Sequence, residues 1–271
     1  MSYHQPTDSE IRERIEAVKD DKYRHAFMFQ LLCCARISEV CGKYAPSRES
    51  VIETEFNGEQ AALFIVKTAK RKGRLRPCAV PLNPLYEPWA KPLLDYFKDC
   101  KEEYPFKFHE NPAHSIRYMQ WEAEEAFDGM MWPMIEYTRT EDLPYTQDMV
   151  LDKRYGETGF DQHLVELQDG ERYWTYNKDI VKRSRKIQSR WKPFRSHCLR
   201  KRRSITLTLD YGFDGFDIAY FGGWTETGKD ESIPSALKHY LHMDLSSAEE
   251  SFTLLKKMAN RYFKKLCVPM A

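Results

Sequence analysis

A nearly unbroken apolar run ends on an arginine, and this junction restricts the fold more than any other feature of the chain. Residues 27–35 read Phe-Met-Phe-Gln-Leu-Leu-Cys-Cys-Ala, and Arg36 follows directly. Such a run belongs in a hydrophobic core, whereas an arginine is almost never fully buried unless it is paired. The fold must therefore give Arg36 an anionic partner or direct it toward a ligand. The nearest candidate partner is Glu39, one helical turn away.

Charge is segregated along the chain, although the total is close to neutral. The 271 residues include 42 Lys or Arg and 41 Asp or Glu, which gives a formal net charge of +1. Residues 178–203, however, hold 12 Lys or Arg and one acid, whereas the charged residues of 122–171 are mostly acidic. A concentrated basic segment is typical of proteins that bind a phosphate backbone. A solvated basic helix face would have the same composition.

Composition also narrows the class of protein. No apolar run approaches the roughly 20 residues that span a bilayer, and the first residues lack the pattern of a secretory signal. Seven cysteines occur without a C-x-x-C pair, which argues against a disulfide framework and a zinc ribbon. We therefore expect an intracellular protein, in the cytoplasm or on the chromosome or nucleoid, with no membrane partner.

Local patterns predict most of the secondary structure. Thr7-Asp8-Ser9-Glu10 is a capping box that begins a helix running to about Lys19. Strands at 51–56 and 61–66 flank Asn57-Gly58, which predicts a hairpin with a type I′ turn. A third strand is expected at 75–82, and its proline restricts it to a sheet edge. Further helices are expected at 23–34, from 37, at 89–103, at 178–190, from 196 to near 212, at 214–221, at 235–243 and at 246–266.

Residues 105–176 interrupt this order. They carry many aromatic and acidic residues, and prolines at 105, 112, 133 and 144 break any helical period. We interpret this stretch as an insertion, with some helix and irregular loops, in a single domain that covers residues 1–271. The sequence does not indicate what the insertion does.

Four stretches far apart in the chain offer functional groups suited to one reaction. Arg36 and Arg200 can each form bidentate bonds to a phosphate and do not lose their charge. His197 precedes Arg200 by three residues, so we expect both on one helix face, and a histidine can exchange a proton near neutral pH. Trp224 and Tyr240 add an indole N–H and a phenol. Such groups could neutralise the oxygens of a phosphodiester during attack without a metal.

In this order, the stretches resemble the catalytic domain of the tyrosine recombinases, the phage-integrase family. The hairpin and the basic loop after it match the strand pair that carries the family's lysine. The resemblance implies an α+β, mainly helical catalytic domain with a small antiparallel β-sheet. Ala35–Val40 and His197–Arg200 match the family's two arginine boxes. Gly222–Trp224 matches the turn that usually reads Leu-Gly-His, and Lys238–His242 matches the nucleophile segment.

The resemblance implies a catalytic role for several residues. Tyr240 would attack the phosphorus and form a 3′-phosphotyrosyl link, which keeps the free energy of the broken bond for religation, so that neither a metal nor another cofactor is expected. Arg36 and Arg200 would hold the phosphate. His197 would contact the same phosphate, and Trp224 would donate its indole N–H to a phosphate oxygen.

Further residues would support the reaction or hold the DNA. Glu39 would orient Arg36 or His197. The lysine that protonates the leaving 5′-oxygen is interpreted as Lys70, because Thr68-Ala69-Lys70 fits the family's local pattern, with Lys67 as the alternative. The residues expected to bind DNA around the site are Arg71, Lys72, Lys182, Arg183, Lys201 and Arg202.

Some features depart from the family's pattern. Tyr240 lies 16 residues after Trp224, farther than is usual, and 161 residues separate Arg36 from His197 because of the insertion. Only a short stretch precedes the first helices, so we expect the family's N-terminal core-binding domain to be absent.

The sequence therefore predicts a site-specific recombinase or integrase that cleaves and rejoins double-stranded DNA, acting as a homo-oligomer, a dimer or tetramer, on the DNA. The helix at 246–266 could pack on a neighbouring subunit or on its own domain. One alternative is a relaxase similar to type IB topoisomerases. Others are a DNA-binding module with a decayed active site and a protein with a basic surface that binds no nucleic acid.

Overall fold

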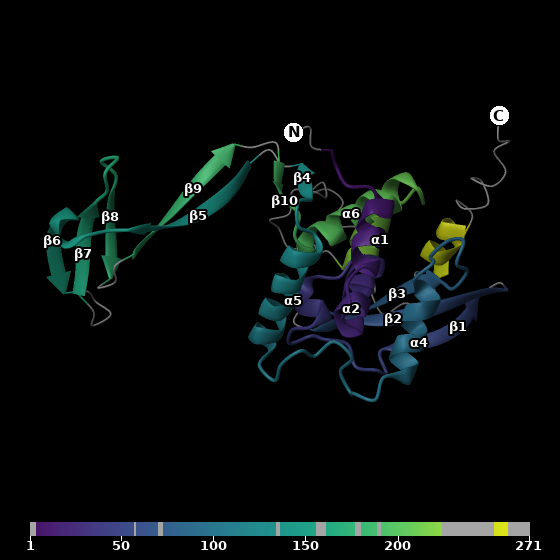
Figure 1. The fold of residues 1–271 in the computed structure, drawn as a ribbon. Coiled ribbons are helices and arrows are strands. Elements are labelled where there is room, and N and C mark those ends of the chain that lie inside the picture. The colour runs from purple at the N-terminus through teal and green to yellow at the C-terminus, as the bar shows by residue number, and fades with distance from the viewer. Residues whose placement is uncertain are drawn as a thin grey trace. The chain divides into compact units, whose positions relative to one another are not determined.

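The chain divides into two compact units in the computed structural model (Figure 1). The larger unit comprises Gln5–Met130 and Pro193–Ala271, and the smaller unit comprises Met131–Lys192 with the N-terminal residues. The main segment of the smaller unit, 131–192, thus begins and ends later in the chain than the insertion expected at 105–176. The residues that the structure describes are 4–56, 58–69, 73–133, 136–155, 161–176, 180–188, 191–223 and 252–259.

Helices dominate the described part of the larger unit, and side chains at their N-termini define where several of them begin. Thr7 and Glu10 form the expected capping box at the first helix, where the backbone N–H of Thr7 donates to Glu10 at 2.8 Å. Asp20, Asn111 and Asp214 accept hydrogen bonds from the first turns of three later helices. The helices are α1 (Asp8–Glu16), α2 (Asp21–Leu32), α3 (Ile37–Val40), α4 (Ala90–Asp99), α5 (Pro112–Ala126), α6 (Ser196–Leu209), α7 (Gly215–Gly222) and a segment over 252–259.

A three-stranded antiparallel sheet completes the larger unit. The predicted hairpin is confirmed, with β1 (Val51–Phe56) paired to β2 (Glu59–Thr68). The third predicted strand is also present, as β3 (Arg74–Pro81), and it lies at the sheet edge beside β2. This edge position tolerates Pro77, which has no N–H to donate to a further strand.

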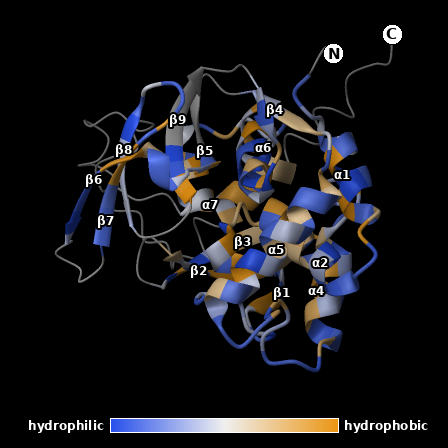
Figure 2. Cartoon of the chain, turned by 60° about the vertical axis from the view of Figure 1, so that its left-hand side comes forward, coloured by the Kyte–Doolittle hydropathy of each residue, from blue (hydrophilic) through white to orange (hydrophobic). Residues whose placement is uncertain are grey.

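The core of the larger unit forms where α2 meets the sheet and α4. Phe29 contacts Phe64 of β2, Phe97 of α4 and Phe106, with ring centroids 5.5–6.0 Å apart. The second half of α2 is buried on all sides, as the apolar run requires. Figure 2 shows the surrounding helices as mixtures of orange, hydrophobic residues and blue, hydrophilic ones, as expected for elements that pack on one face.

The smaller unit is built from antiparallel strands. Its core contains Tyr145, Val165, Leu167 and Val181. A short 3-10 helix, η2 (Gln147–Met149), precedes the strands of a three-stranded sheet. The strands are β4 (Met131–Pro133) paired with β10 (Trp191–Pro193), β5 (Glu136–Pro144) paired with β9 (Ile180–Gln188), and β6 (Val150–Tyr155), β7 (Asp161–Glu166) and β8 (Arg172–Tyr176) in the order β6-β7-β8.

The expected fold class is wrong in its specific form. The chain is α+β, but four antiparallel sheets occur among the described residues, in place of one small sheet in a mainly helical domain. Most of the difference comes from residues 105–176, interpreted as helix and irregular loops. They contain α5 and then five strands. Strands β6, β7 and β8 pair as successive hairpins, whereas β4 and β5 pair with β10 and β9, which lie much later in the chain.

The helix expected at 178–190 is also wrong, because this segment contains strand β9. Its nine residues pair in unbroken register with β5, from Glu136 opposite Gln188 to Pro144 opposite Ile180. The abundance of Lys and Arg favoured a helix, whereas the pairing with β5 determines a strand.

The C-terminal helical segment packs against its own unit where it is described. Leu255 lies against Ala61 and Ala79 of the sheet, and Lys257 donates to Asp217 of α7 at 2.7 and 2.8 Å. Residues 252–259 therefore use their apolar face within the chain. The helix expected at 235–243 lies outside the described residues. None of the described helices is both long and apolar enough to cross a bilayer.

Candidate active site

The carboxylate of Glu39 is the centre of a buried cluster of arginines. Arg36 donates from Nη1 to Glu39 Oε1 at 2.9 Å. On the other oxygen, Oε2, Arg76 Nη2 lies at 3.6 Å and Arg200 Nη1 at 3.8 Å. The side chains of Glu39 and Arg76 are fully buried, that of Arg200 is 3% exposed, and that of Arg36 is 15% exposed. Arg36 is thus the member of the cluster most open to a ligand.

The same cluster brings together the two arginine boxes, the glycine turn and the basic loop, whereas the nucleophile segment around Tyr240 lies outside the described residues. The backbone N–H of Ala69, next to Lys70, donates to Glu39 Oε1 at 3.0 Å. Arg200 Nη1 donates to the carbonyl of Cys34 at 2.6 Å, and its Nη2 donates to the carbonyl of Gly222 at 2.8 Å. Segments from the first arginine box, the basic loop, the second box and the glycine turn therefore meet around one carboxylate.

A sharp turn between α2 and α3 presents Arg36 to this cluster. Cys34 adopts φ +50°, the only positive φ of a non-glycine residue among those described, a conformation that costs about 1 kcal/mol or more for such residues. Glu39 then accepts from the backbone N–H of Arg36 at 3.0 Å, as in a capping box. Local sequence thus fixes the Arg36–Glu39 contact, and the same carboxylate faces the rest of the cluster.

Arg76 is a member of the cluster that the sequence did not reveal. It lies on β3 and donates from Nη1 to the carbonyl of Cys33 at 3.0 Å and to the carbonyl of Phe221. It therefore links the end of α2, Glu39 and the end of α7. The local signal was a charged residue near the start of a strand whose second half is apolar. Arginines near strand ends are commonly exposed, so this signal did not single out Arg76.

The glycine turn after α7 fits closely over Arg76. Gly223 caps the helix with φ +62°. A Cβ at Gly223 would lie 2.7 Å from both Cδ and Nε of Arg76 and 3.1 Å from Thr68 Oγ1. The turn thus requires glycine for its backbone conformation and for its close approach to the cluster.

The electrostatics of the cluster favour an additional anion. Burial by itself would raise the pKa of Glu39, but the Arg76 charge and the N–H groups of Arg36 and Ala69 outweigh it, so this pKa is lowered. Burial and the neighbouring arginines lower the pKa of Arg200 to about 10, which leaves it charged at neutral pH. Three guanidinium groups thus surround one carboxylate. An anionic ligand at the exposed edge would relieve their mutual repulsion.

Other predicted catalytic residues are less closely connected to this cluster or are not described. His197 is exposed at the start of α6, whereas Arg200 is buried, although we expected both side chains on one face of this helix. Lys67 is half-buried near the end of β2. Lys70, Trp224 and Tyr240 lie outside the described residues, as do Arg71 and Lys72 among the predicted DNA-binding residues.

The remaining predicted DNA-binding residues have different environments. Arg183 is buried in the smaller unit, bonded from Nη2 to Asp169 at 2.5 Å, with its Nε 3.2 Å from Glu171. Arg202 donates to Asp8 at 2.6 Å. By contrast, Lys182 is exposed on β9, and Lys201 is half-buried on α6. Arg183 is therefore engaged by two carboxylates and has a structural explanation.

Comparison with protein-family models, with curated proteins and with solved structures finds no match to this chain. The fold of this chain therefore does not match a recombinase catalytic domain of known structure. Within the described ranges, no three His, Cys, Asp or Glu side chains are grouped so that they could hold a metal ion. The site geometry is the basis for any functional interpretation.

Proposed function

We propose that the protein cleaves and rejoins strands of double-stranded DNA through a covalent tyrosine–phosphate intermediate, as in site-specific recombination or integration. The observation that carries the proposal is the meeting of the two arginine boxes, the basic loop and the glycine turn around Glu39 and Arg200. Arg36 and Arg200 contact this carboxylate, Ala69 donates to it, and Arg200 also holds the carbonyl of Gly222. An ordinary surface ion pair would need only two of these groups.

The cluster is suited to a phosphodiester in the transition state. A phosphodiester under attack gains charge on its non-bridging oxygens, and guanidinium groups fixed in advance stabilise that charge without reorganising. Burial and the contacts to Glu39 and two backbone carbonyls hold the Arg200 side chain in place. Arg36, the more exposed of the two, would supply the first contact to the phosphate.

The remaining groups of the proposal are assigned by the resemblance in sequence, and Tyr240, Lys70 and Trp224 among them lie outside the described residues. Tyr240 would attack phosphorus, giving its phenolic proton to His197 and forming the Tyr240 O–P bond as the P–O5′ bond breaks. The leaving 5′-oxygen would take a proton from Lys70, or from Lys67 as the alternative. Reversal of the step by a 5′-hydroxyl would rejoin the strand, so the bond energy is retained in the intermediate. Trp224 and His197 would contact the phosphate oxygens.

A suicide-substrate experiment tests this proposal. The probe is a pool of nicked duplexes with a randomised central segment. After cleavage, the short fragment that carries the free 5′-hydroxyl diffuses away, so the protein stays attached to the 3′-phosphate. We expect a covalent adduct on a denaturing gel with the wild-type chain and none with Tyr240→Phe, which should still bind the pool. An adduct of unchanged yield in Tyr240→Phe would contradict the role of Tyr240.

The lysine assignment has its own chemical test. Lys70→Ala should slow cleavage of the normal duplex, and a 5′-phosphorothiolate at the scissile bond should restore the rate, because its sulfur leaves without a proton. Restoration in Lys67→Ala in place of Lys70→Ala would transfer the role to Lys67. Relaxation of supercoiled plasmid by the monomer without a preferred site would instead favour the topoisomerase-like alternative.

A further inference from the structure

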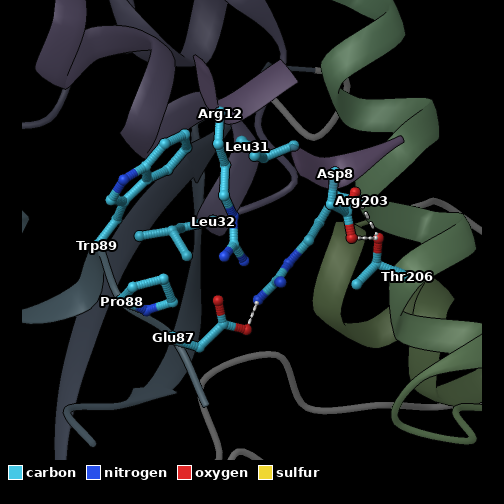
Figure 3. A pocket seen from close by; sticks show the side chains of 9 residues that line it. All are labelled: Asp8, Arg12, Leu31, Leu32, Glu87, Pro88, Trp89, Arg203 and Thr206. Atoms are coloured by element: carbon cyan, nitrogen blue, oxygen red, sulfur yellow. Dashed lines mark hydrogen bonds and ion pairs between the residues drawn. The ribbon is translucent and has the colours of Figure 1, made fainter. Parts of the chain in front are cut away.

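A small pocket in the larger unit lies between α1, α2, α6 and the loop before α4 (Figure 3). Its partly exposed rim includes Asp8, Arg12 and Pro88, whereas Trp89 and Arg203 are buried. Figure 3 shows Arg12 entering from α1 and Arg203 from α6, with both guanidinium groups directed toward the middle of the pocket. Neither Arg12 nor Arg203 has a role in the reaction proposed above.

Arg203 is a buried cation with part of its hydrogen-bonding capacity unused. Only 3% of the residue is exposed. Its Nη2 donates to Glu87 Oε1 at 2.6 Å, and the hydroxyl of Tyr211 donates to the same oxygen at 2.9 Å. Its Nε is buried and has no hydrogen-bond partner within the described part of the chain. A buried N–H without an acceptor costs about 1–3 kcal/mol, so an acceptor reaching this atom would be stabilised.

Arg12 has no carboxylate partner among the described residues, although it lies near several acids. Its guanidinium lies over the ring of Trp89, 5.6 Å from the centroid. Its buried Nε also lacks a hydrogen-bond partner in the ranges that the structure describes. The acids nearby are already engaged: Glu16 accepts from the Trp89 indole at 3.0 Å, and Asp8 accepts from Arg202 and Thr206. The pocket therefore contains one cation that lacks an anion.

We propose that this pocket binds a phosphate group, with Arg12 and the Nε–H of Arg203 as its donors. The enclosed space is about 10 Å³, roughly the room needed by one water-sized atom. A single non-bridging phosphate oxygen fits that space, while the rest of the group stays at the rim beside Arg12. An arginine whose guanidinium face packs on an indole keeps the N–H groups along its edge available for two bonds to an oxyanion.

The favoured source of this phosphate is the DNA backbone away from the cleaved bond, and this part of the inference rests on the proposed function. A phosphodiester carries one negative charge, which matches the one unpaired cation. Helix α6 connects the two places, because Arg200 of the Glu39 cluster lies one turn before Arg203 on it. Free inorganic phosphate has the same chemistry and is the other source to be tested.

Substitution of Arg12, with Arg14 as a matched control, tests the inference in the full-length chain. Arg14 lies on the same helix, carries the same charge and is exposed outside the pocket. We expect Arg12→Gln to weaken binding of a duplex pool about tenfold, as loss of one charge-assisted bond does. The slope of log affinity against log salt should fall by about 0.9. Arg14→Gln should stay within about twofold of wild type, and Arg12→Lys should be intermediate.

A second measurement identifies the source and the chemistry of the ligand. Thermal melting in inorganic phosphate, with acetate at equal ionic strength as the carboxylate probe, should show stabilisation by phosphate that Arg12→Gln removes. Phosphate stabilisation that depends on Arg12 without any change in DNA affinity would assign the pocket to free phosphate.

Three results would overturn the phosphate pocket. They are equal losses of DNA affinity in the Arg12 and Arg14 variants, equal stabilisation by acetate, or no effect of Arg12→Gln in either assay. Because DNA affinity is measured separately from the Tyr240 adduct, failure of the pocket leaves the adduct intact. Failure of the adduct, conversely, leaves the dependence of affinity on Arg12 measurable.

Discussion

Arg36 and Arg200 at Glu39 and Arg183 of strand β9 all come from segments that the sequence assigned to DNA, yet their surroundings differ. At Glu39, Arg36, Arg76 and Arg200 share one carboxylate. In β9, Arg183 alone has two carboxylates, Asp169 and Glu171. Among the described residues, the first place thus has three cations around one carboxylate, and the second has one cation between two carboxylates. Local charge balance, more than the density of basic residues, therefore separates a candidate ligand site from a structural ion pair.

The largest effect should come from altering the planar donor fork at each place. Arg200→Lys retains the charge but cannot keep the bonds to Cys34, Gly222 and Glu39 together, so we expect single-turnover cleavage of the nicked duplex to slow by about 10²–10³-fold. Arg183→Lys, the matched change in β9, should leave the rate unchanged while lowering the melting temperature. Equal rate losses in both variants would remove the distinction between the two places.

Neutralising the shared carboxylate should destabilise the larger unit. Glu39→Gln leaves three guanidinium groups around a neutral amide, and we expect the free energy of unfolding to fall by about 3 kcal/mol, as when a buried charge pair is broken. Urea denaturation followed by tryptophan fluorescence measures this. Asp95→Asn, which breaks the exposed Lys91–Asp95 pair, is the control and should cost less than about 1 kcal/mol. A similar small loss for Glu39→Gln would mean that the cluster is not held by this carboxylate.

Two glycines with similar backbone angles separate backbone strain from contact with the cluster. A Cβ at Gly223 (φ +62°) would lie 2.7 Å from Arg76, whereas a Cβ at Gly212 (φ +69°) would meet open space. We expect Gly212→Ala to cost about 1 kcal/mol through strain alone. Gly223→Ala should cost about 2 kcal/mol or more, because the contact adds to the strain, and it should slow cleavage. Equal costs and an unaffected rate would show that the turn does not position the cluster.

The smallest effect expected is a pH dependence of stability from Glu39. Its pKa in the folded chain lies below the ordinary value of 4.5. Its contribution is therefore fully present above that ordinary value and is lost as pH falls through the lower, folded-state pKa. Urea midpoints between pH 6 and pH 3 should fall less steeply for Glu39→Gln than for the wild type. Parallel curves would indicate that Glu39 does not titrate differently on folding.

Several parts of the fold that depend on neighbours in sequence were predictable, although the β6–β7 and β7–β8 hairpins, which also pair over short separations, were missed. The Thr7–Glu10 capping box, the β1–β2 hairpin and the end of α7 at the glycine turn all follow from residues a few positions apart. Strand β9 was not predictable in this way, because its partner β5 lies about 40 residues earlier along the chain. A basic composition alone is compatible with either a helix or a strand.

The candidate site divides along the same line. Arg36 and Glu39 were visible as neighbours on one short helix. Arg76 was not, because its importance comes from meeting Cys33 and Phe221, which are distant in sequence. The charge balance of Arg183 depends likewise on a turn before β8. Long-range pairing, which no local pattern records, thus decides which basic residues share a carboxylate and which are neutralised by two.

Mapping the covalent adduct tests the central claim most directly. The adduct formed with a nicked duplex would be digested with nuclease and trypsin, and the peptide carrying the residual nucleotide would be sequenced by mass spectrometry. The account predicts a nucleotide joined through a 3′-phosphate to Tyr240, lost in Tyr240→Phe and strongly reduced in Arg200→Lys. A nucleotide on another tyrosine, such as Tyr262, or an adduct indifferent to Arg200, would contradict it.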